Sequence, residues 1–212
     1  MNVYRFSSLV PYKKGLELQR RLRALHEMDA DRGDDLILLE HEPVYTIGRT
    51  RDHHSLGAAA HLPSPVYEIH RGGQATYHGP GQLTGYPIVD LNRRRKDIHA
   101  YVACLEKALI AACAHWGVQA ASREGLTGVW VGVRKLASIG VGVRKWVTAH
   151  GFAVNVTPVS LPPFRHIIPC GLDGVVMTCL QNEGAMCSTE EFSAVLAPCL
   201  ESILEAEMPV RG

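Results

Sequence analysis

The sequence predicts an α+β fold with a mixed, largely antiparallel central sheet flanked by helices. Three helical segments, near the start, the middle and the end of the chain, alternate with groups of short strand-like runs. A parallel sheet would need single strands alternating with helices, an all-β fold would need strands throughout, and the chain follows neither pattern. Its 212 residues suit one domain, which we expect to span residues 1–212.

The helices are predicted from the spacing of their apolar residues. Leucines recur near helical spacing over residues 12–30, where His26 is expected on the solvent side. Residues 98–116 carry apolar side chains at steps of three or four, and Gly117 ends that helix. The last helix begins at Ser188, with a glutamate three positions later, which is the spacing of a capping box.

Short apolar runs bounded by glycine, proline or polar residues predict the strands. They are the runs 35–39, 44–47, 66–70, 86–91, 118–121, 128–131, 136–143 and 147–156. Residues 50–65 are rich in His, Gly, Ala and Pro without any period, so we expect a loop there. The motif VGVRK occurs twice, at 131–135 and 141–145; the period of ten residues is too short for a solenoid unit, and there are only two copies. We therefore interpret them as two successive turns of a β-meander.

Composition argues against several classes of protein. Twenty-two basic and 21 acidic residues give a formal charge of +1, so no electrostatic argument favours nucleic acid or an anionic membrane as a partner. No run approaches the ~20 apolar residues of a membrane span, and the first residues lack a secretory signal, so we expect a cytoplasmic protein. The basic run Arg93–Lys96 is interpreted as a solvated loop before a helix, with docking of an acidic partner as the alternative.

The six cysteines form no CxxC or CxxH pair, so no zinc site or other metal site is expected. Cys170 lies between proline and glycine, which places its thiol on a turn and makes it a candidate nucleophile. Three others lie in predicted helices and are expected to be buried and inert, and two remain open. The helical ones are Cys104, Cys113 and Cys199, and the open ones are Cys179 and Cys187.

A dense glycine segment, RGGQATYHGPGQLTGYP, occupies residues 71–87 and has two readings. It is either a bulged hairpin or a backbone that must approach a ligand closely, since glycine and proline are costly in an ordinary strand. The GK[ST] ending of a phosphate-binding loop is absent, so a nucleotide-phosphate cradle is disfavoured.

A thiol such as Cys170 needs activation, because with a pKa of ~8.5 it is only a few per cent thiolate at pH 7. A lysine ammonium about 4 Å away would attract the thiolate by roughly 4 kcal/mol at an effective dielectric of 20. Lys135 and Lys145, which end the two VGVRK copies, are the candidates, and local sequence does not choose between them. His78 and His150, flanked by glycine, are candidate bases.

Four motifs occur in order across residues 71–171: RGGQATYHGPGQLTGYPIVDL, GVWVGVRKLASIG, HGFAVNV and FRHIIPCG. Together they closely resemble the lipoyl(octanoyl) transferases of lipoate biosynthesis, and HEPVYTIGR at 41–49 extends the resemblance. It implies the α+β fold that this family shares with biotin and lipoate protein ligases. One departure is Val133, where the family often carries an acidic residue.

The resemblance implies that Cys170 takes an octanoyl group from octanoyl-acyl carrier protein as a thioester and that Lys135 activates the thiol, whereas Lys145 has no counterpart. The implied acceptors are lipoyl domains of 2-oxoacid dehydrogenase complexes and the glycine-cleavage H protein. No cofactor is expected, because the donor thioester is already activated. The implied substrate cleft is lined by Arg71, Gly72, Gly73, Gln74, Ala75, Thr76, Tyr77, His78, Ser138, Ile139, Gly140, Gly151, Phe152 and Ala153.

The implied reaction also needs groups that stabilise its oxyanion and a place for the acyl tail, and other functions compete with it as interpretations of the sequence. Backbone amides at Cys170–Gly171 or Gly79–Gly81 are candidates to stabilise the oxyanion. The octanoyl tail would bury about six methylenes at ~0.8 kcal/mol each, so an apolar tunnel is expected. The main alternative is an ATP-dependent lipoate or biotin protein ligase of the same fold. A carrier-protein-binding module without activity and a cysteine hydrolase with His150 as base are the others.

Overall fold

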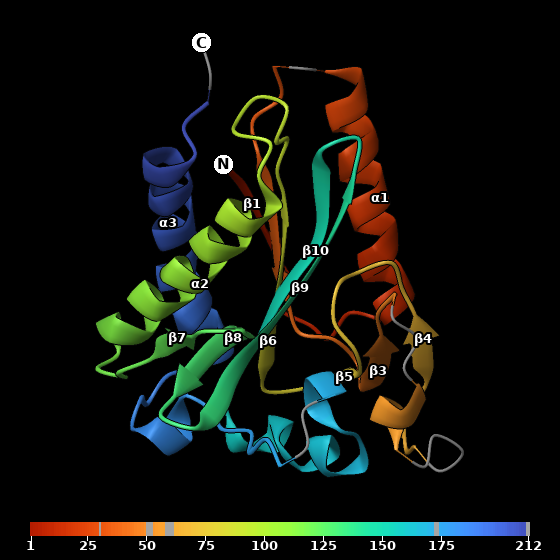
Figure 1. The fold of residues 1–212 in the computed structure, drawn as a ribbon, viewed down its shortest axis with the longest axis vertical. Coiled ribbons are helices and arrows are strands. Elements are labelled where there is room, and N and C mark those ends of the chain that lie inside the picture. The colour runs from red at the N-terminus through yellow and green to blue at the C-terminus, as the bar shows by residue number, and fades with distance from the viewer. Residues whose placement is uncertain (30, 50–52, 58–61, 172–173, 211–212) are drawn as a thin grey trace.

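The computed structural model describes residues 1–29, 31–49, 53–57, 62–171 and 174–210, with His53 and Cys170 described for the backbone only. Its centre is a seven-stranded sheet in the order β1-β2-β6-β10-β9-β8-β7, beside a three-stranded sheet in the order β4-β3-β5 (Figure 1). The strands of the large sheet are β1 (Asn2–Arg5), β2 (Asp35–Leu39), β6 (Gln82–Ile88), β10 (Val147–Asn155), β9 (Arg134–Arg144), β8 (Leu126–Val131) and β7 (Ala121–Arg123). Those of the small sheet are β4 (Val66–Glu68), β3 (Val44–Ile47) and β5 (Thr76–His78).

Most strand pairs are antiparallel. In the large sheet β1 and β2 pair in parallel, and every later neighbour in the order pairs antiparallel. In the small sheet β3 pairs in parallel with β4 and antiparallel with β5. The predicted α+β class with a mixed, largely antiparallel sheet is confirmed.

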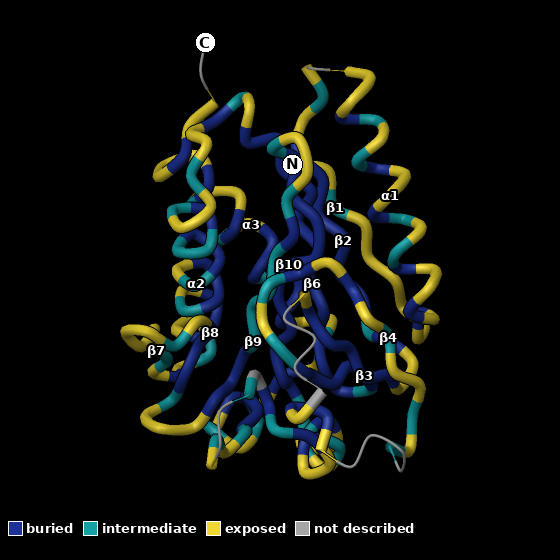
Figure 2. Tube along the Cα trace, turned by 45° about the vertical axis from the view of Figure 1, so that its right-hand side comes forward, coloured by how far each residue is buried: buried dark blue, intermediate teal, exposed yellow. Residues whose placement is uncertain are grey.

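Three α-helices cover the large sheet on both faces (Figure 1). They are α1 (Tyr12–Met28), α2 (Ile98–His115) and α3 (Thr189–Glu207). Strand β2 is buried throughout because its side chains alternate between two cores, since Leu36 and Leu38 pack with α2 and α3 while Ile37 and Leu39 pack with α1. Figure 2 shows these central strands as the buried interior and the outer side of α1 as exposed.

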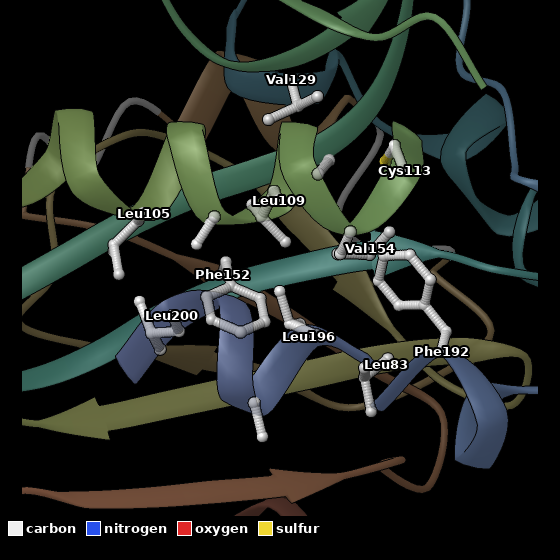
Figure 3. Close-up of a cluster of buried hydrophobic side chains, with 14 of the residues drawn as sticks. Leu83, Leu105, Leu109, Cys113, Val129, Phe152, Val154, Phe192, Leu196 and Leu200 are labelled. Atoms are coloured by element: carbon white, nitrogen blue, oxygen red, sulfur yellow. The ribbon is translucent and has the colours of Figure 1, made fainter. Parts of the chain in front are cut away.

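The larger core lies between α2, α3 and one face of the sheet (Figure 3). Leu105 and Leu109 of α2 and Leu196 of α3 approach the ring of Phe152 on β10. The periodic apolar residues that predicted the two helices are thus the residues that bury them. The capping box at Ser188 and Glu191 is present, which confirms the predicted start of α3.

Several expectations need correction. Strand β1 was not expected, β5 lies inside the glycine segment, and β6 begins there at Gln82, before the predicted run 86–91. The run 118–121 is not a strand, because β7 begins only at Ala121. Short 3-10 helices are also present, including one in the predicted loop 50–65, whose residues 50–52 and 58–61 lie outside the described residues. These helices are η1 (His53–Leu56), η3 (Pro158–Ser160), η4 (Pro162–His166), η5 (Pro169–Gly171) and η6 (Gln181–Glu183).

Two charged residues expected at the surface are buried. Arg94, in the run interpreted as a solvated loop, is 2% exposed and binds carboxylates and carbonyls from distant segments. His26 is also buried, and its Nε2 lies 3.0 Å from Asp35 Oδ2. In both cases a carboxylate from another element compensates for burial. No helix in the described ranges is long and apolar enough to cross a membrane.

Candidate active site

Arg71 organises the first part of the glycine segment. Its guanidinium donates to the carbonyl oxygens of Gly72 (2.9 Å) and Gln74 (2.8 Å). It also donates to the carbonyl and hydroxyl oxygens of Thr46 on β3, at 3.1 and 2.9 Å. A residue expected to contact substrate therefore also holds the loop 71–74 against the small sheet.

Glycines in this region permit close contacts between backbones. A Cβ at Gly48 would lie 2.0 Å from the carbonyl oxygen of Gly73, and a Cβ at Gly140 would lie 2.8 Å from that of Gly72. The loop can therefore approach both β3 and β9 only because side chains are absent there. The bulged-hairpin interpretation is wrong, because β5 pairs with β3 in the small sheet and β6 pairs with β2 and β10 in the large one, so the two strands of this segment do not pair with each other.

A small cavity of about 40 Å³ lies between this loop, β6, β9 and β10. Ten of the residues predicted for the substrate cleft line it. Two others, Ala75 and Tyr77, are buried elsewhere, in a cluster with Tyr45. The ten are Arg71, Gly73, Thr76, His78, Ser138, Ile139, Gly140, Gly151, Phe152 and Ala153.

The sequence did not predict the rest of this wall, which comes from Tyr12, Ile69, Thr84, Tyr86 and His150. Only His150 had drawn attention, as a candidate base. Tyr12 opens a helix and Ile69 follows a strand, so nothing in their local sequence indicated a cavity.

The histidines beside the small cavity are held neutral. Burial lowers the pKa of His150 to about 4 and that of His78 well below its ordinary value. His78 is bonded on one side to Gln82 Oε1, with 2.9 Å between the atoms. Burial also lowers the pKa of His41 to about 4, although the hydrogen bond of its ring to the Val10 carbonyl opposes this shift. A histidine with so low a pKa is a weak base at neutral pH, which disfavours a hydrolase built on His150.

The two VGVRK copies are successive hairpins, as predicted, but they sit differently on their turns. In the first, the turn precedes Arg134, so Lys135 is already in strand β9 and is 1% exposed. In the second, Lys145 is itself a turn residue with φ 51°, and its exposed amine lies 2.8 Å from Glu27. Only the first lysine therefore lies in the interior. Val133 is exposed in the first turn.

The ammonium of Lys135 lies at a larger cavity of about 630 Å³ between α2, β8 and β9. It donates to the carbonyl oxygen of Thr127 at 3.0 Å and lies 5.1 Å from the centre of the Trp130 ring. Gly73, Ile139 and Gly140 line both this cavity and the small one. The two cavities are therefore neighbours that share a wall. Gly72 lines the larger one.

The turn that carries Cys170 meets the glycine segment. Ser55 accepts from Ile168 with its carbonyl (2.8 Å) and from Ala75 with its hydroxyl (3.1 Å), so it joins the two segments. A Cβ at Gly171 would lie 1.3 Å from the side-chain oxygen of Gln74, which places this predicted cleft residue against the turn.

The chain after this turn reaches Lys135. The backbone amide of Lys135 donates to the carbonyl oxygen of Val176 (2.8 Å), and the amide of Thr178 donates to the carbonyl oxygen of Lys135 (2.9 Å). The described backbone thus joins Lys135 to residues 176–178, and the Cys170 turn meets the glycine segment at Gln74, while the Cys170 side chain lies outside the described part of the structure. Two of the expected oxyanion donors are already used, because the Gly171 amide donates to the Ile168 carbonyl (2.9 Å) and the Gly81 amide to the Glu40 carboxylate (2.5 Å).

The other five thiols are poor nucleophiles. Cys104, Cys113, Cys179 and Cys187 are buried and Cys199 is half-buried. Burial raises the pKa of all five, to about 12 for Cys113 and about 11 for Cys187. Among the residues that the structure describes, no group of three or more His, Cys, Asp or Glu side chains is placed to hold a metal ion.

Solved structures share this fold. A bi-partite lipoate protein ligase from Thermoplasma acidophilum superposes with a TM-score of 0.73 at 16% identity, covering 97% of this chain and 84% of the other. The biotin protein ligase from Aquifex aeolicus gives 0.55 at 12% identity, covering 97% and 69%. The architecture is therefore that of the lipoate and biotin protein ligases.

Sequence relatives define the family. The lipoyl protein ligase A/B catalytic domain matches residues 11–201. An octanoyltransferase of Gloeobacter violaceus is 49% identical over 82% of this chain and 77% of its own length. One of Geotalea uraniireducens is 45% identical over 96% and 93%. The chain belongs to the lipoyl protein ligase A/B family and, within it, to the octanoyltransferases, which makes it an acyltransferase and confirms the resemblance.

Proposed function

We propose that this protein transfers an octanoyl group from octanoyl-acyl carrier protein to a lysine of lipoyl domains, through a thioester on Cys170. The acceptors would be lipoyl domains of 2-oxoacid dehydrogenase complexes and the glycine-cleavage H protein, in the cytoplasm. The observation that supports the proposal is that the glycine segment links the two candidate groups: Gly72 and Gly73 line the cavity at buried Lys135, and Gln74 lies against Gly171 of the Cys170 turn. The name of the relatives, octanoyltransferase, supports octanoyl as the acyl group that is transferred.

In the first half-reaction the Cys170 thiol has passed its proton to Lys135, and the thiolate, paired with the Lys135 ammonium, attacks the donor carbonyl. The tetrahedral intermediate then expels the carrier thiolate, which takes the proton back from the Lys135 ammonium. A new C–S bond to Cys170 replaces the C–S bond to the carrier, so no oxidant or ATP is needed.

In the second half-reaction the acceptor lysine attacks the Cys170 thioester as a neutral amine. The amide bond forms, Cys170 leaves as the thiolate, and the proton lost by the attacking nitrogen passes through Lys135 to the thiol. One group that gains and loses a proton can thus serve both steps.

The two cavities suit the two ends of the thioester. The small one, with Ile69, Ile139 and Phe152 in its wall, would receive the acyl tail, and it would have to widen to do so, because a tail of about six methylenes needs more room than about 40 Å³. The larger one opens beside the Lys135 amine and would receive the arm of the carrier or of the acceptor lysine. The reacting carbonyl would then lie where they meet, at Gly73 and Gly140.

The central experiment is intact-mass measurement after mixing the protein with octanoyl-acyl carrier protein. We expect one octanoyl addition in the wild type, none in Cys170→Ser, and one in the control Cys199→Ser, which removes a half-buried thiol. Transfer by Cys170→Ser at the wild-type rate would refute the thioester.

An ATP-dependent ligase of the same fold is the rival, and the same reagents test it. Free octanoate, ATP and a lipoyl domain should give no octanoylated product with this protein. Product formed in that mixture would favour the ligase, because a ligase activates the free acid and has no need of Cys170.

The lysine pair provides an internal control. Lys135→Ala should raise the pH at which Cys170 is alkylated, whereas Lys145→Ala, which removes an exposed turn lysine, should leave it unchanged. The reverse result would mean that the second copy of the repeat carries the active lysine.

A further inference from the structure

The carboxylate of Glu106 and the ammonium of Lys135 are connected through one peptide group. Glu106, half-buried on α2, accepts a hydrogen bond from the amide of Gly128, with 2.9 Å between N and Oε1. Lys135 donates to the carbonyl of Thr127, with 3.0 Å between Nζ and O. That carbonyl and that amide belong to the same planar peptide unit, so the two side chains bind opposite ends of one dipole.

The backbone of β8 is shaped for this contact. Gly128 has φ +128°, which a residue with a side chain rarely adopts. A Cβ there would lie 2.5 Å from the carbonyl oxygen of Ala137 and 2.9 Å from Cε of Lys135. The lysine stem therefore passes through the space that a side chain at 128 would fill, and the pairing of β8 with β9 shifts register just after it.

An anionic acceptor on the N–H makes the carbonyl of the same peptide a better acceptor. Hydrogen bonds in a chain polarise one another, and bonds with a charged partner at either end are the stronger ones. Thr127 is exposed at the surface, whereas Gly128 is buried, so this peptide crosses from the surface to the interior at the contact with α2. The contact also fixes α2 to β8 at the wall of the larger cavity.

We propose that Glu106 is a positioning residue for the acyl-transfer reaction, which holds Lys135 through the Thr127–Gly128 peptide. The inference rests on the proposed function, in which Lys135 moves the proton of the Cys170 thiol. Glu106 orients the lysine amine through the carbonyl that the amine binds, and it does not exchange protons with substrate.

The charged neighbours of Lys135 single out this carboxylate. The charged or titratable side chains that line the larger cavity with Lys135 are Arg49, His99, Glu106 and Arg123. Glu106 is the only carboxylate among the described residues that line it. Arg123 lies over the Trp130 ring, with 5.0 Å from its guanidinium carbon to the ring centre, and Arg134 on β9 is paired outside the cavity with Glu183.

The first test compares Glu106→Ala with Glu106→Gln. The glutamine keeps an oxygen that can accept from Gly128, while alanine leaves that amide unpaired. We expect Glu106→Ala to slow single-turnover acylation of Cys170 by about 10-fold to 100-fold, the range for losing a hydrogen bond to a charged group. Glu106→Gln should stay within about fivefold of wild type, and the donor concentration at half-maximal rate should change less than threefold in both.

Lys107→Gln is the matched control, because Lys107 is the next residue on α2 and its exposed amine pairs with Glu207. It should acylate at the wild-type rate. Equal loss in Glu106→Ala and Glu106→Gln, or a loss in Lys107→Gln as large as in Glu106→Ala, would overturn the positioning role.

A second measurement needs no substrate and so separates this inference from the proposed function. Trace labelling of amines with acetic anhydride, mapped by mass, reports the reactivity of Lys135 directly. We expect Lys135 to be at least threefold more reactive in Glu106→Ala than in wild type or Glu106→Gln. Unchanged reactivity in Glu106→Ala would overturn the inference even if Cys170 proved essential, and increased reactivity would uphold the contact even if Cys170→Ser remained active.

Discussion

Arg94 offers the sharpest test of how the fold is held. Its guanidinium donates to Asp34 (2.5 Å) and Glu205 (2.6 Å), and to the carbonyls of Leu204 (3.1 Å) and Met208. It thereby joins the segment before β2 to the last turn of α3. The perturbation we consider is Arg94→Ala, which leaves all four acceptors without this donor.

The expected cost follows from the burial of the partners. The Asp34 side chain is 7% exposed, so its carboxylate would lose a charged partner in a poorly solvated place, which costs about 3–5 kcal/mol. Glu205 adds little, because its side chain is 55% exposed and water replaces the contact. For a chain of this length, each kcal/mol lowers the midpoint of thermal unfolding by about 2–4 °C, which gives a drop of roughly 6–20 °C.

The assay is urea unfolding followed by circular dichroism, together with a thermal scan. Arg95→Ala is the control, since Arg95 is the next residue and its side chain is 64% exposed in a pair with Asp97. It should change the free energy of unfolding by less than about 1 kcal/mol. A loss below about 1 kcal/mol in Arg94→Ala would refute the reasoning, because it would mean that the buried acceptors do not depend on this guanidinium.

Three further predictions concern buried polar groups and a helix end. Thr84 and Thr148 are both buried, but only the Thr148 hydroxyl is bonded, to Val89 and Pro87, so in urea unfolding Thr148→Val should cost about 1–3 kcal/mol and Thr84→Val should cost nothing. A cost at Thr84 would reveal a bound water or ligand as its partner. The free energy of unfolding should fall as the pH drops from about 6.5 to 4, because His41 and His150 have a pKa of about 4 in the folded protein and take up protons at higher pH in the unfolded chain. His41→Gln should make the free energy of unfolding depend less on pH over this range. An unchanged dependence would exclude His41 as its source. Ser188→Ala should lower the free energy of unfolding by about 1 kcal/mol by removing the cap of α3, and no change on calorimetry would contradict the capping contact.

Much of the fold could be predicted from local patterns. The helices α2 and α3 were clear because their apolar residues face one core, and the residues that set the period are the residues that pack. Strand β1 escaped prediction because most of its four residues are exposed and it pairs only along one edge, in parallel with β2. Strand β5 and the first half of β6 escaped because the glycines and prolines around them resemble turns, although both strands are fully buried, while the end of β6 falls in the predicted run 86–91.

The candidate site was predictable only where the motif itself carried information. Outside the site the same limit applies: Arg94 and His26 looked like surface residues because their partners come from other elements, which local sequence does not show. Lys135 and Lys145 have identical local sequence, and only their placement relative to the hairpin turns separates a buried lysine from an exposed one. The resemblance to octanoyltransferases favoured Lys135, and its burial agrees with that choice.

The wall shared by the two cavities at Gly73, Ile139 and Gly140 has a kinetic consequence. Under the proposed mechanism the acyl tail remains in the small cavity for the whole cycle, while donor and acceptor use the larger one in turn. Each carrier is then a competitor of the other. An excess of acceptor should inhibit by occupying the unacylated enzyme, and an excess of spent donor should inhibit by occupying the acylated one. The ratio of the two carriers in the cell, more than the amount of either, would then set the rate of the enzyme.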